Sequence, residues 1–305
     1  MRLLPLLLVC APFAAHAEPL TIVTDIPPVQ SLVQMVAGDR GTVTALLEPN
    51  ADPHHFQLRP SQARQLSNAD LLIWIGEDMT PWLARARDGV ALDVPHMPFI
   101  EDEDHTGESE DDDHAGESEE EDHHGETEEE EDHHHEDPHF WLSTLEATEM
   151  VEHIEHKLSD LDPEGAELYR SNADAAILEI QSLTKAILSL LEDVRTVPFA
   201  VTHDGFQYFV RQFELTQVGS LSDIQDSAAS AKTVSNLAEM AKSGEIVCVF
   251  GEVAESNKLA QVLVDEGAKL GKSLDPAGIS LNRGPTLYSE LILGMAQSFK
   301  DCLSD

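Results

Sequence analysis

Apolar residues along this chain form short continuous runs that alternate with longer stretches of helical period. The runs have the length and composition of buried strands, and they cover residues 20–24, 42–47, 71–75, 200–202 and 246–250. After the first run, Pro27 and Pro28 mark a turn, and a helical pattern through Leu32 and Val36 follows it. Strands that alternate with helices predict parallel α/β sheets.

One uninterrupted helical pattern separates the two groups of strands. Apolar residues recur in steps of three or four from Tyr169 to Leu191, and Pro163 stands where a helix begins. A helix over residues 163–195 would be about 50 Å long. We therefore predict an α/β protein with two Rossmann-like lobes, each with a parallel sheet, joined by one long rigid helix. The predicted boundaries are a signal peptide at 1–17, an N-terminal lobe at 18–162, a linking helix at 163–195 and a C-terminal lobe at 196–305.

Residues 101–137 depart from this pattern, with 22 Asp or Glu, seven His and no Lys or Arg. Such a composition buries no core, so we expect a disordered loop. Near-copies of a nine-residue unit begin at Asp104, Asp113 and Asp122, and they place histidines at regular intervals among carboxylates. Imidazole among carboxylates suits transition metals, so weak metal sites are expected in this loop. Its histidines are His105, His114, His123, His124, His133, His134 and His135.

The acidic balance extends beyond the loop. Without those 22 carboxylates the net charge of −40 becomes about −18. A protein this negative repels nucleic acid and anionic membrane surfaces. Cations are therefore the expected cargo.

The first residues predict export. Arg2 precedes an apolar stretch over residues 3–15, and Ala15 and Ala17 form a small-residue cleavage site around His16. This is typical of a secretory signal peptide, and the periplasm is the expected location. Removal of the peptide also removes Cys10 and leaves an even pair of cysteines.

The remaining pair is Cys248 and Cys302, and an oxidising compartment favours a disulfide between them. We expect this bond to hold the C-terminal helix against the sheet. Two free thiols that ligate a metal are the alternative, but neither cysteine has a metal-binding neighbour at short spacing.

Three histidines outside the loop lie in similar settings beside strands or turns. His54 and His139 each follow an Asp-Pro pair, and His203 follows the predicted strand at 200–202. A single histidine in such a place is ordinarily a hydrogen-bonded polar side chain. Three in comparable settings indicate metal ligation.

Residues 135–139 (HEDPH) match the H-E-x-x-H motif of zinc proteases, which requires both histidines on one helical face. Pro138 lies inside the motif and disfavours a helix there. The motif therefore does not indicate a protease.

Four candidate ligand segments, and the strand that follows the first of them, resemble the periplasmic metal-binding components of bacterial zinc and manganese importers of the ATP-binding-cassette type, in particular the zinc branch. They are residues 51–61 (ADPHHFQLRPS) with the following 68–76 (NADLLIWIG), 138–143 (PHFWLS), 203–209 (HDGFQYF) and 274–276 (LDP). The resemblance covers essentially the whole mature chain. An insertion rich in histidine and acids before the second segment is itself typical of zinc members.

The resemblance implies that His54, His139 and His203 ligate the metal, with His55 as the rival at the first position. Some zinc members have Glu directly before the first histidine, where this chain has Pro53. The fourth donor is then Asp275 or a water molecule. Three imidazoles and at most one oxygen suit tetrahedral zinc, whereas manganese prefers more carboxylates.

The sequence thus predicts a zinc receptor rather than an enzyme. It would capture Zn²⁺ between two lobes as a monomer and deliver it to the membrane permease of an ATP-binding-cassette importer. A zinc hydrolase or hydratase is one alternative, because catalytic zinc also has three protein ligands and an open position. A zinc storage or chaperone protein, or an adhesin, is another.

Overall fold

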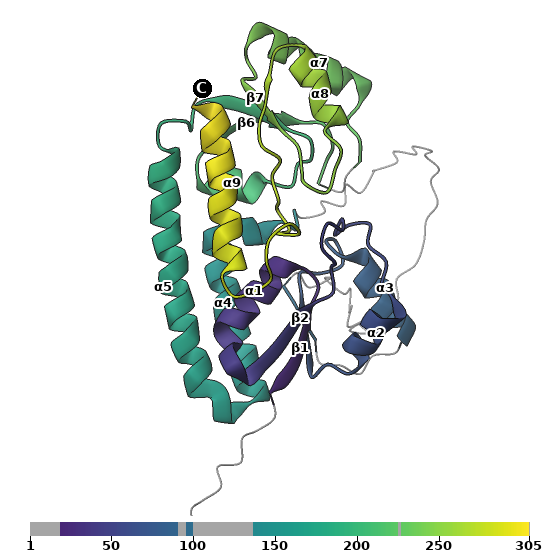
Figure 1. The fold of residues 1–305 in the computed structure, drawn as a ribbon, viewed down its shortest axis with the longest axis vertical. Helices are drawn as coiled ribbons and strands as arrows, with labels where there is room; N and C mark the ends of the chain where they lie inside the picture. Colours follow the sequence, from purple (N-terminus) through teal and green to yellow (C-terminus); the bar gives the residue numbers. More distant parts are fainter. Residues whose placement is uncertain (1–18, 91–95, 100–136, 225–226, 305) are drawn as a thin grey trace, which may run out of the picture.

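The structure is a computed structural model that describes residues 19–90, 96–99, 137–224 and 227–304. These residues form two α/β units, each built on a four-stranded parallel sheet (Figure 1). The predicted fold class of two parallel-sheet lobes and a long helix is confirmed. The predicted signal peptide and most of the acidic loop, including its seven histidines, lie outside the described residues.

The first sheet has the strand order β2-β1-β3-β4 and the second has the order β6-β5-β7-β8. In both sheets every described pairing is parallel. The strands of the first sheet are β1 (Leu20–Thr24), β2 (Gly41–Ala45), β3 (Leu71–Trp74) and β4 (His96–Pro98). Those of the second are β5 (Pro198–Val201), β6 (Thr216–Ser220), β7 (Cys248–Phe250) and β8 (Lys269–Leu270).

Helices connect the strands and pack against the sheets. In the first half of the chain they are α1 (Pro27–Ala37), α2 (Pro60–Ser67), α3 (Pro81–Val90) and α4 (Thr144–Leu161). In the second half they are α5 (Ala166–Leu191), α6 (Gln207–Gln212), α7 (Ala231–Ser243), α8 (Lys258–Asp265) and α9 (Leu287–Leu303). Short 3₁₀ turns are η1 (Gly38–Arg40), η2 (Phe140–Leu142) and η3 (Pro163–Gly165).

Two predicted elements begin or end differently in the structure. Pro27 and Pro28 are the first residues of α1 rather than a turn before it, because the first turn of a helix tolerates a missing backbone N–H. The long helix α5 has 26 residues, from Ala166 to Leu191, and is therefore about 40 Å long. The 3₁₀ turn η3 carries the proline that the sequence pattern placed at the helix start.

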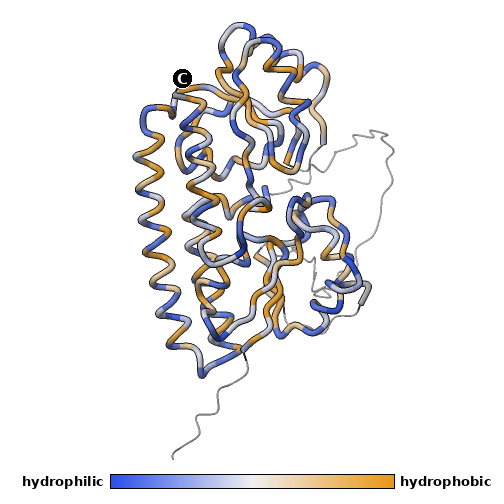
Figure 2. The backbone as a smooth tube through the Cα atoms, viewed as in Figure 1, coloured by the Kyte–Doolittle hydropathy of each residue, from blue (hydrophilic) through white to orange (hydrophobic). Residues whose placement is uncertain are grey.

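Helix α5 runs along one side of both units, with α9 and α4 beside it (Figure 1). Apolar and polar residues alternate along these helices (Figure 2), and the buried residues of α5 include Tyr169, Ile180 and Leu191. One hydrophobic cluster is continuous from β1 and α1 through α4, α5 and α9 to β5 and β7. The two units are therefore joined by a shared core, and separating them would expose apolar surface.

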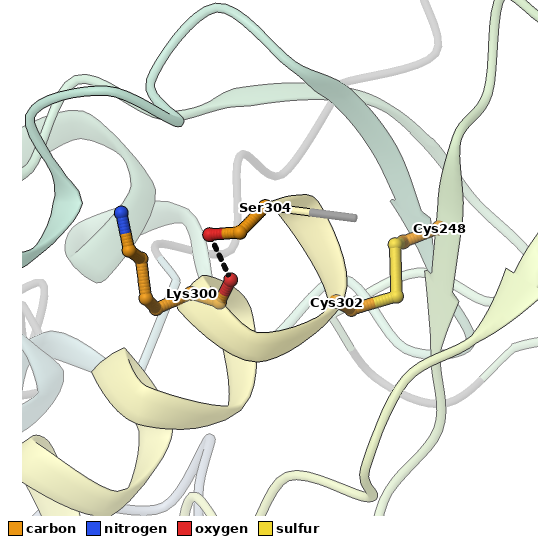
Figure 3. The surroundings of a disulfide bond; sticks show 4 residues. All are labelled: Cys248, Lys300, Cys302 and Ser304. Carbon is orange, nitrogen blue, oxygen red and sulfur yellow. Dashed lines mark hydrogen bonds between the residues drawn. A yellow bond between two sulfur atoms is a disulfide. The ribbon is translucent and has the colours of Figure 1, made fainter.

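The predicted disulfide between Cys248 and Cys302 is present (Figure 3). It links β7 to the last turn of α9, 54 residues further along the chain. Phe299 of α9 packs against Phe199 and Phe250 in the same region, with ring centroids 5.0 and 4.8 Å apart. The bond thus fixes α9 to the second sheet where aromatic packing already holds it.

No helix in the described part of the chain combines the length and the apolar character that a membrane span requires.

Candidate metal centre

Three histidine side chains from distant parts of the chain converge between the two sheets. One ring nitrogen from each of His54, His139 and His203 lies within 4.8 Å of the other two. The ring centroids are 5.5 Å apart for His54 and His139, 5.6 Å for His54 and His203, and 5.1 Å for His139 and His203. Within the described ranges this is the one such group of histidine, cysteine or acidic residues. The structure therefore brings together the three histidines that the sequence singled out.

His54 lies in the loop between β2 and α2, and a local turn directs it inward. Its backbone N–H donates to Asp52 Oδ1 at 2.8 Å, which is the turn that an aspartate forms with the residue two positions later. The indole N–H of Trp82 donates to the Pro53 carbonyl at 2.6 Å and holds this loop against α3. The His55 ring points away, with 67% of its side chain exposed, and contacts Asp52 Oδ2 at 3.0 Å. Of the two adjacent histidines, only His54 reaches the centre.

His139 repeats the same turn directly before η2. Its backbone N–H donates to Asp137 Oδ1 at 3.0 Å, and its Nδ1 lies 2.8 Å from the same oxygen. The ring is buried, and its centroid is 5.2 Å from that of Trp141. Trp141 is itself fully buried and donates its indole N–H to the Pro276 carbonyl at 2.9 Å. His139 is therefore fixed both by its own aspartate and by a tryptophan tied to the second unit.

His203 follows β5 at the carboxyl edge of the second sheet, where ligands of parallel sheets commonly bind. Its Nδ1 lies 2.7 Å from Glu252 Oε1, and Glu252 follows the neighbouring strand β7. The ring is buried, and its Nε2 has a long contact of 3.4 Å to the Ile224 carbonyl. Gly205 lies against two of the rings: a Cβ there would be 2.7 Å from His203 Cε1 and 3.0 Å from His139 Nε2. A side chain at this position would therefore force the His203 ring to shift.

The cavity between the histidines has a volume of about 20 Å³, which is room for about one water-sized particle. Its wall includes Met79, Trp141 and Pro276 together with the three imidazoles. His54 Nε2 is buried and has no hydrogen-bond partner among the described residues. An unpartnered buried nitrogen is costly unless something binds to it. A single cation in this cavity would satisfy it.

The electrostatics prepare His54 to act as a ligand. The pKa of its ring is lowered to about 3, mainly by burial and also by repulsion from His139 and His203, while the charge of Asp52 opposes this shift. The ring is therefore neutral at physiological pH. Protons compete little with a metal for this nitrogen.

We expect the same shift to make the metal-free protein less stable in acid. Unfolded His54 binds a proton below about pH 6.5, whereas folded His54 does so only near pH 3. Because the unfolded state binds more protons in this window, the free energy of unfolding falls as the pH falls from 6.5 toward 3. Urea unfolding of the chelator-treated protein between pH 7 and pH 5 measures this slope. For His54→Gln, the free energy of unfolding should change less with pH in the same window. A slope identical to that of the parent protein would contradict a lowered pKa at His54.

Asp275 also lines the cavity but is not in the group of converging ligand atoms. Its Oδ1 accepts the backbone N–H of Ile279 at 2.9 Å, and its Oδ2 accepts the N–H and the hydroxyl of Ser280 at 2.9 and 2.5 Å. In this structure the carboxylate stabilises the turn after Pro276. The fourth donor, Asp275 or a water molecule, stays a prediction.

Glu252, Asp137 and Gly205 are site residues that the sequence reasoning missed. The Asp-Pro-His pattern, present at residues 52–54 and again at 137–139, could have indicated Asp137, because the turn is local. Glu252 has no comparable signal, since it is 49 residues from the histidine it contacts.

Residues 22–302 match the protein family described as ZnuA, zinc-uptake complex component A, periplasmic. The High-affinity zinc uptake system protein ZnuA of Paracoccus denitrificans (strain Pd 1222) is 40% identical, and the alignment covers 96% of this chain and 94% of that protein. A protein of the same name from Brucella suis biovar 1 (strain 1330) is 33% identical, with 93% and 91% covered. The crystal structure of the Zn(II)-bound ZnuA-like domain of Streptococcus pneumoniae AdcA has a TM-score of 0.66 and 26% identity, over 94% of this chain and 100% of that domain.

Proposed function

Because the chain belongs to the ZnuA family of periplasmic zinc-uptake components, we propose that it is an exported receptor that captures Zn²⁺ with His54, His139 and His203. It then hands the ion to the permease of an ATP-binding-cassette importer. The convergence of the three imidazoles on a cavity for one ion carries this proposal. Zinc here is cargo, so the receptor must both bind it and release it.

The donor set fits zinc. Three neutral imidazoles with one further oxygen donor make a four-coordinate site, with zinc about 2.0 Å from each nitrogen. Manganese favours more oxygen donors and a higher coordination number. Among the residues that the structure describes, no carboxylate joins the three nitrogens within 4.8 Å. This supports zinc over manganese.

We assign the fourth donor to a water molecule. Both oxygens of Asp275 already accept hydrogen bonds from the 279–280 turn, and moving the carboxylate toward an ion would break them. Water requires no such rearrangement. It also leaves with the ion, which suits a site that must give up its cargo.

Hydrolysis, the main alternative, needs space for a substrate beside the zinc-bound water. A cavity of about 20 Å³ holds only one small particle. The relatives compared above are named for zinc uptake rather than for an enzymatic activity. We infer that the three-histidine site binds and does not catalyse.

The remaining predictions belong to the same proposal. A cleaved signal peptide at residues 1–17 would bring the protein to the periplasm, where the permease is accessible from outside the inner membrane. We expect a monomer. We expect the histidines of residues 101–137 to bind further ions weakly, because a segment of the disorder that this composition predicts must be ordered at each binding event.

Deletion of residues 101–136 tests the receptor proposal against storage. We expect calorimetry to show one tight zinc site in both proteins, and additional weak sites only in the full-length chain. The deletion removes charged residues of a segment expected to bury little apolar surface, so the tight affinity should change little. Loss of nearly all bound zinc from the deleted protein would instead make the loop the main function, as storage requires.

The same pair of proteins tests whether the loop speeds capture. An anionic segment raises the local cation concentration, and salt screens this effect. Stopped-flow zinc uptake at low salt should be faster for the full-length protein, and the difference should shrink at high salt. Equal rates at low salt would exclude a delivery role.

A further inference from the structure

Two of the three histidines are each paired with their own carboxylate at the Nδ1 atom of the ring. His139 Nδ1 lies 2.8 Å from Asp137 Oδ1, and His203 Nδ1 lies 2.7 Å from Glu252 Oε1. Both carboxylates are largely buried, with 14% and 11% of their side chains exposed. His54 has no such partner, because the second oxygen of Asp52 contacts His55 instead.

These pairs determine which ring nitrogen is available to an ion. A carboxylate only accepts hydrogen bonds, so Nδ1 of each paired ring carries the hydrogen and donates it. In a neutral imidazole the other nitrogen, Nε2, then carries the lone pair. His139 and His203 are thus held in the tautomer that ligates through Nε2, and partners of this kind also raise the basicity of a ligating imidazole.

The pairs also change the charge of the site. Three neutral imidazoles leave both positive charges of a zinc ion uncompensated in a buried cavity, which is unfavourable. Asp137 and Glu252 together supply two negative charges beside the histidine rings, and Glu252 also lines the cavity. Their attraction for an ion is proportional to the charge of that ion, so a dication gains about twice as much from them as a monocation.

We propose that Glu252 and Asp137 are positioning residues that orient His203 and His139 and, through their charge, make the three-histidine site selective for divalent over monovalent metal ions. This inference rests on the proposed function, because it assumes that zinc binds at these histidines. It adds Glu252 and Asp137 as the residues that make the site prefer divalent ions.

Glu252 is the better residue to test. Asp137 also accepts the backbone N–H of His139, so its replacement would disturb the turn itself. Glu252→Gln keeps an oxygen that can accept the Nδ1 hydrogen and removes only the charge. Glu252→Ala removes both the charge and the acceptor. Glu239→Gln removes one charge from α7 of the same unit, at a position away from the histidines, and serves as the matched control.

The experiment compares the affinities of these proteins for Zn²⁺ and for Ag⁺, a monovalent ion that also binds imidazole, in chloride-free buffer. We expect Glu252→Gln to weaken Zn²⁺ binding by about 10- to 100-fold, as loss of a partner behind a ligand does. For Ag⁺ the loss should be about the square root of that factor, because the ion carries half the charge. Glu239→Gln should leave both affinities within about twofold of the parent.

A second readout separates orientation from charge. The visible absorption of bound Co²⁺ reports the geometry of its ligands, so Glu252→Gln should keep the parent spectrum whereas Glu252→Ala should change it. The inference would be overturned if Glu252→Gln lost affinity for Zn²⁺ and Ag⁺ by the same factor, or if its Zn²⁺ affinity were unchanged. In either case, tight zinc binding by the parent protein would still support the proposed function. Absence of tight zinc binding in the parent would overturn both.

Discussion

Replacing His139 or His203 with alanine is expected to weaken zinc binding by roughly 100-fold or more. Structural zinc sites with four protein ligands bind with about 10–16 kcal/mol at neutral pH, so one ligand contributes on the order of 3 kcal/mol, which is a factor of about 100. Both rings are buried and converge with His54 on one cavity, and no other histidine among the described residues joins this group. Competition against a chelator of known zinc affinity measures the loss.

The adjacent histidines of the first loop supply the matched control. His54→Ala should have a loss of similar size, whereas His55→Ala should have little effect, because the His55 ring is mostly exposed and contacts Asp52. A damaging His55→Ala together with a silent His54→Ala would show that the first ligand is misassigned. Asp275→Ala in the same assay tests the fourth position: unchanged affinity supports water, and a partial loss supports the carboxylate.

Removing the disulfide is expected to lower the free energy of unfolding by about 4 kcal/mol. The bond closes a segment of 54 residues, and the chain-entropy account gives about this value for a loop of that length. The appropriate variant is Cys248→Ala with Cys302→Ala, since Cys248 is fully buried and a serine would place a hydroxyl in the core. Urea unfolding of the metal-free protein measures the difference.

Reduction of the parent protein should reproduce this loss, and the double variant should not respond to the reductant. We expect the folded variant to keep its tight zinc site, because Phe299 still packs against Phe199 and Phe250 at the base of the second sheet. A loss below about 1 kcal/mol would mean that the unfolded chain gains little freedom when the bond is absent.

Many strands, helices and turns of this protein could be predicted from short-range patterns in the sequence. The strand β3 is visible in the sequence as a continuous apolar run, and α5 as apolar residues spaced three or four positions apart. Each pattern follows from the backbone period of the element. The turns that carry His54 and His139 need only three consecutive residues: an aspartate, a proline that restricts the backbone, and the N–H of the histidine. This local pattern marked His54 and His139 as a similar pair, and the structure brings both of them together with His203.

The tertiary structure decided the features that depend on which segments become neighbours. Glu252 reaches His203 only because β7 lies beside β5, and Gly205 is required only because two rings approach the same point. The sequence left Asp275 or water as the fourth donor, and the hydrogen bonds of Asp275 to the 279–280 turn became visible only in the folded chain. The cavity volume and the core shared by both units likewise depend on how helices and sheets pack. Local period fixes which face of an element is apolar, whereas contacts between distant elements depend on sheet order, register and rotation, which no local pattern encodes.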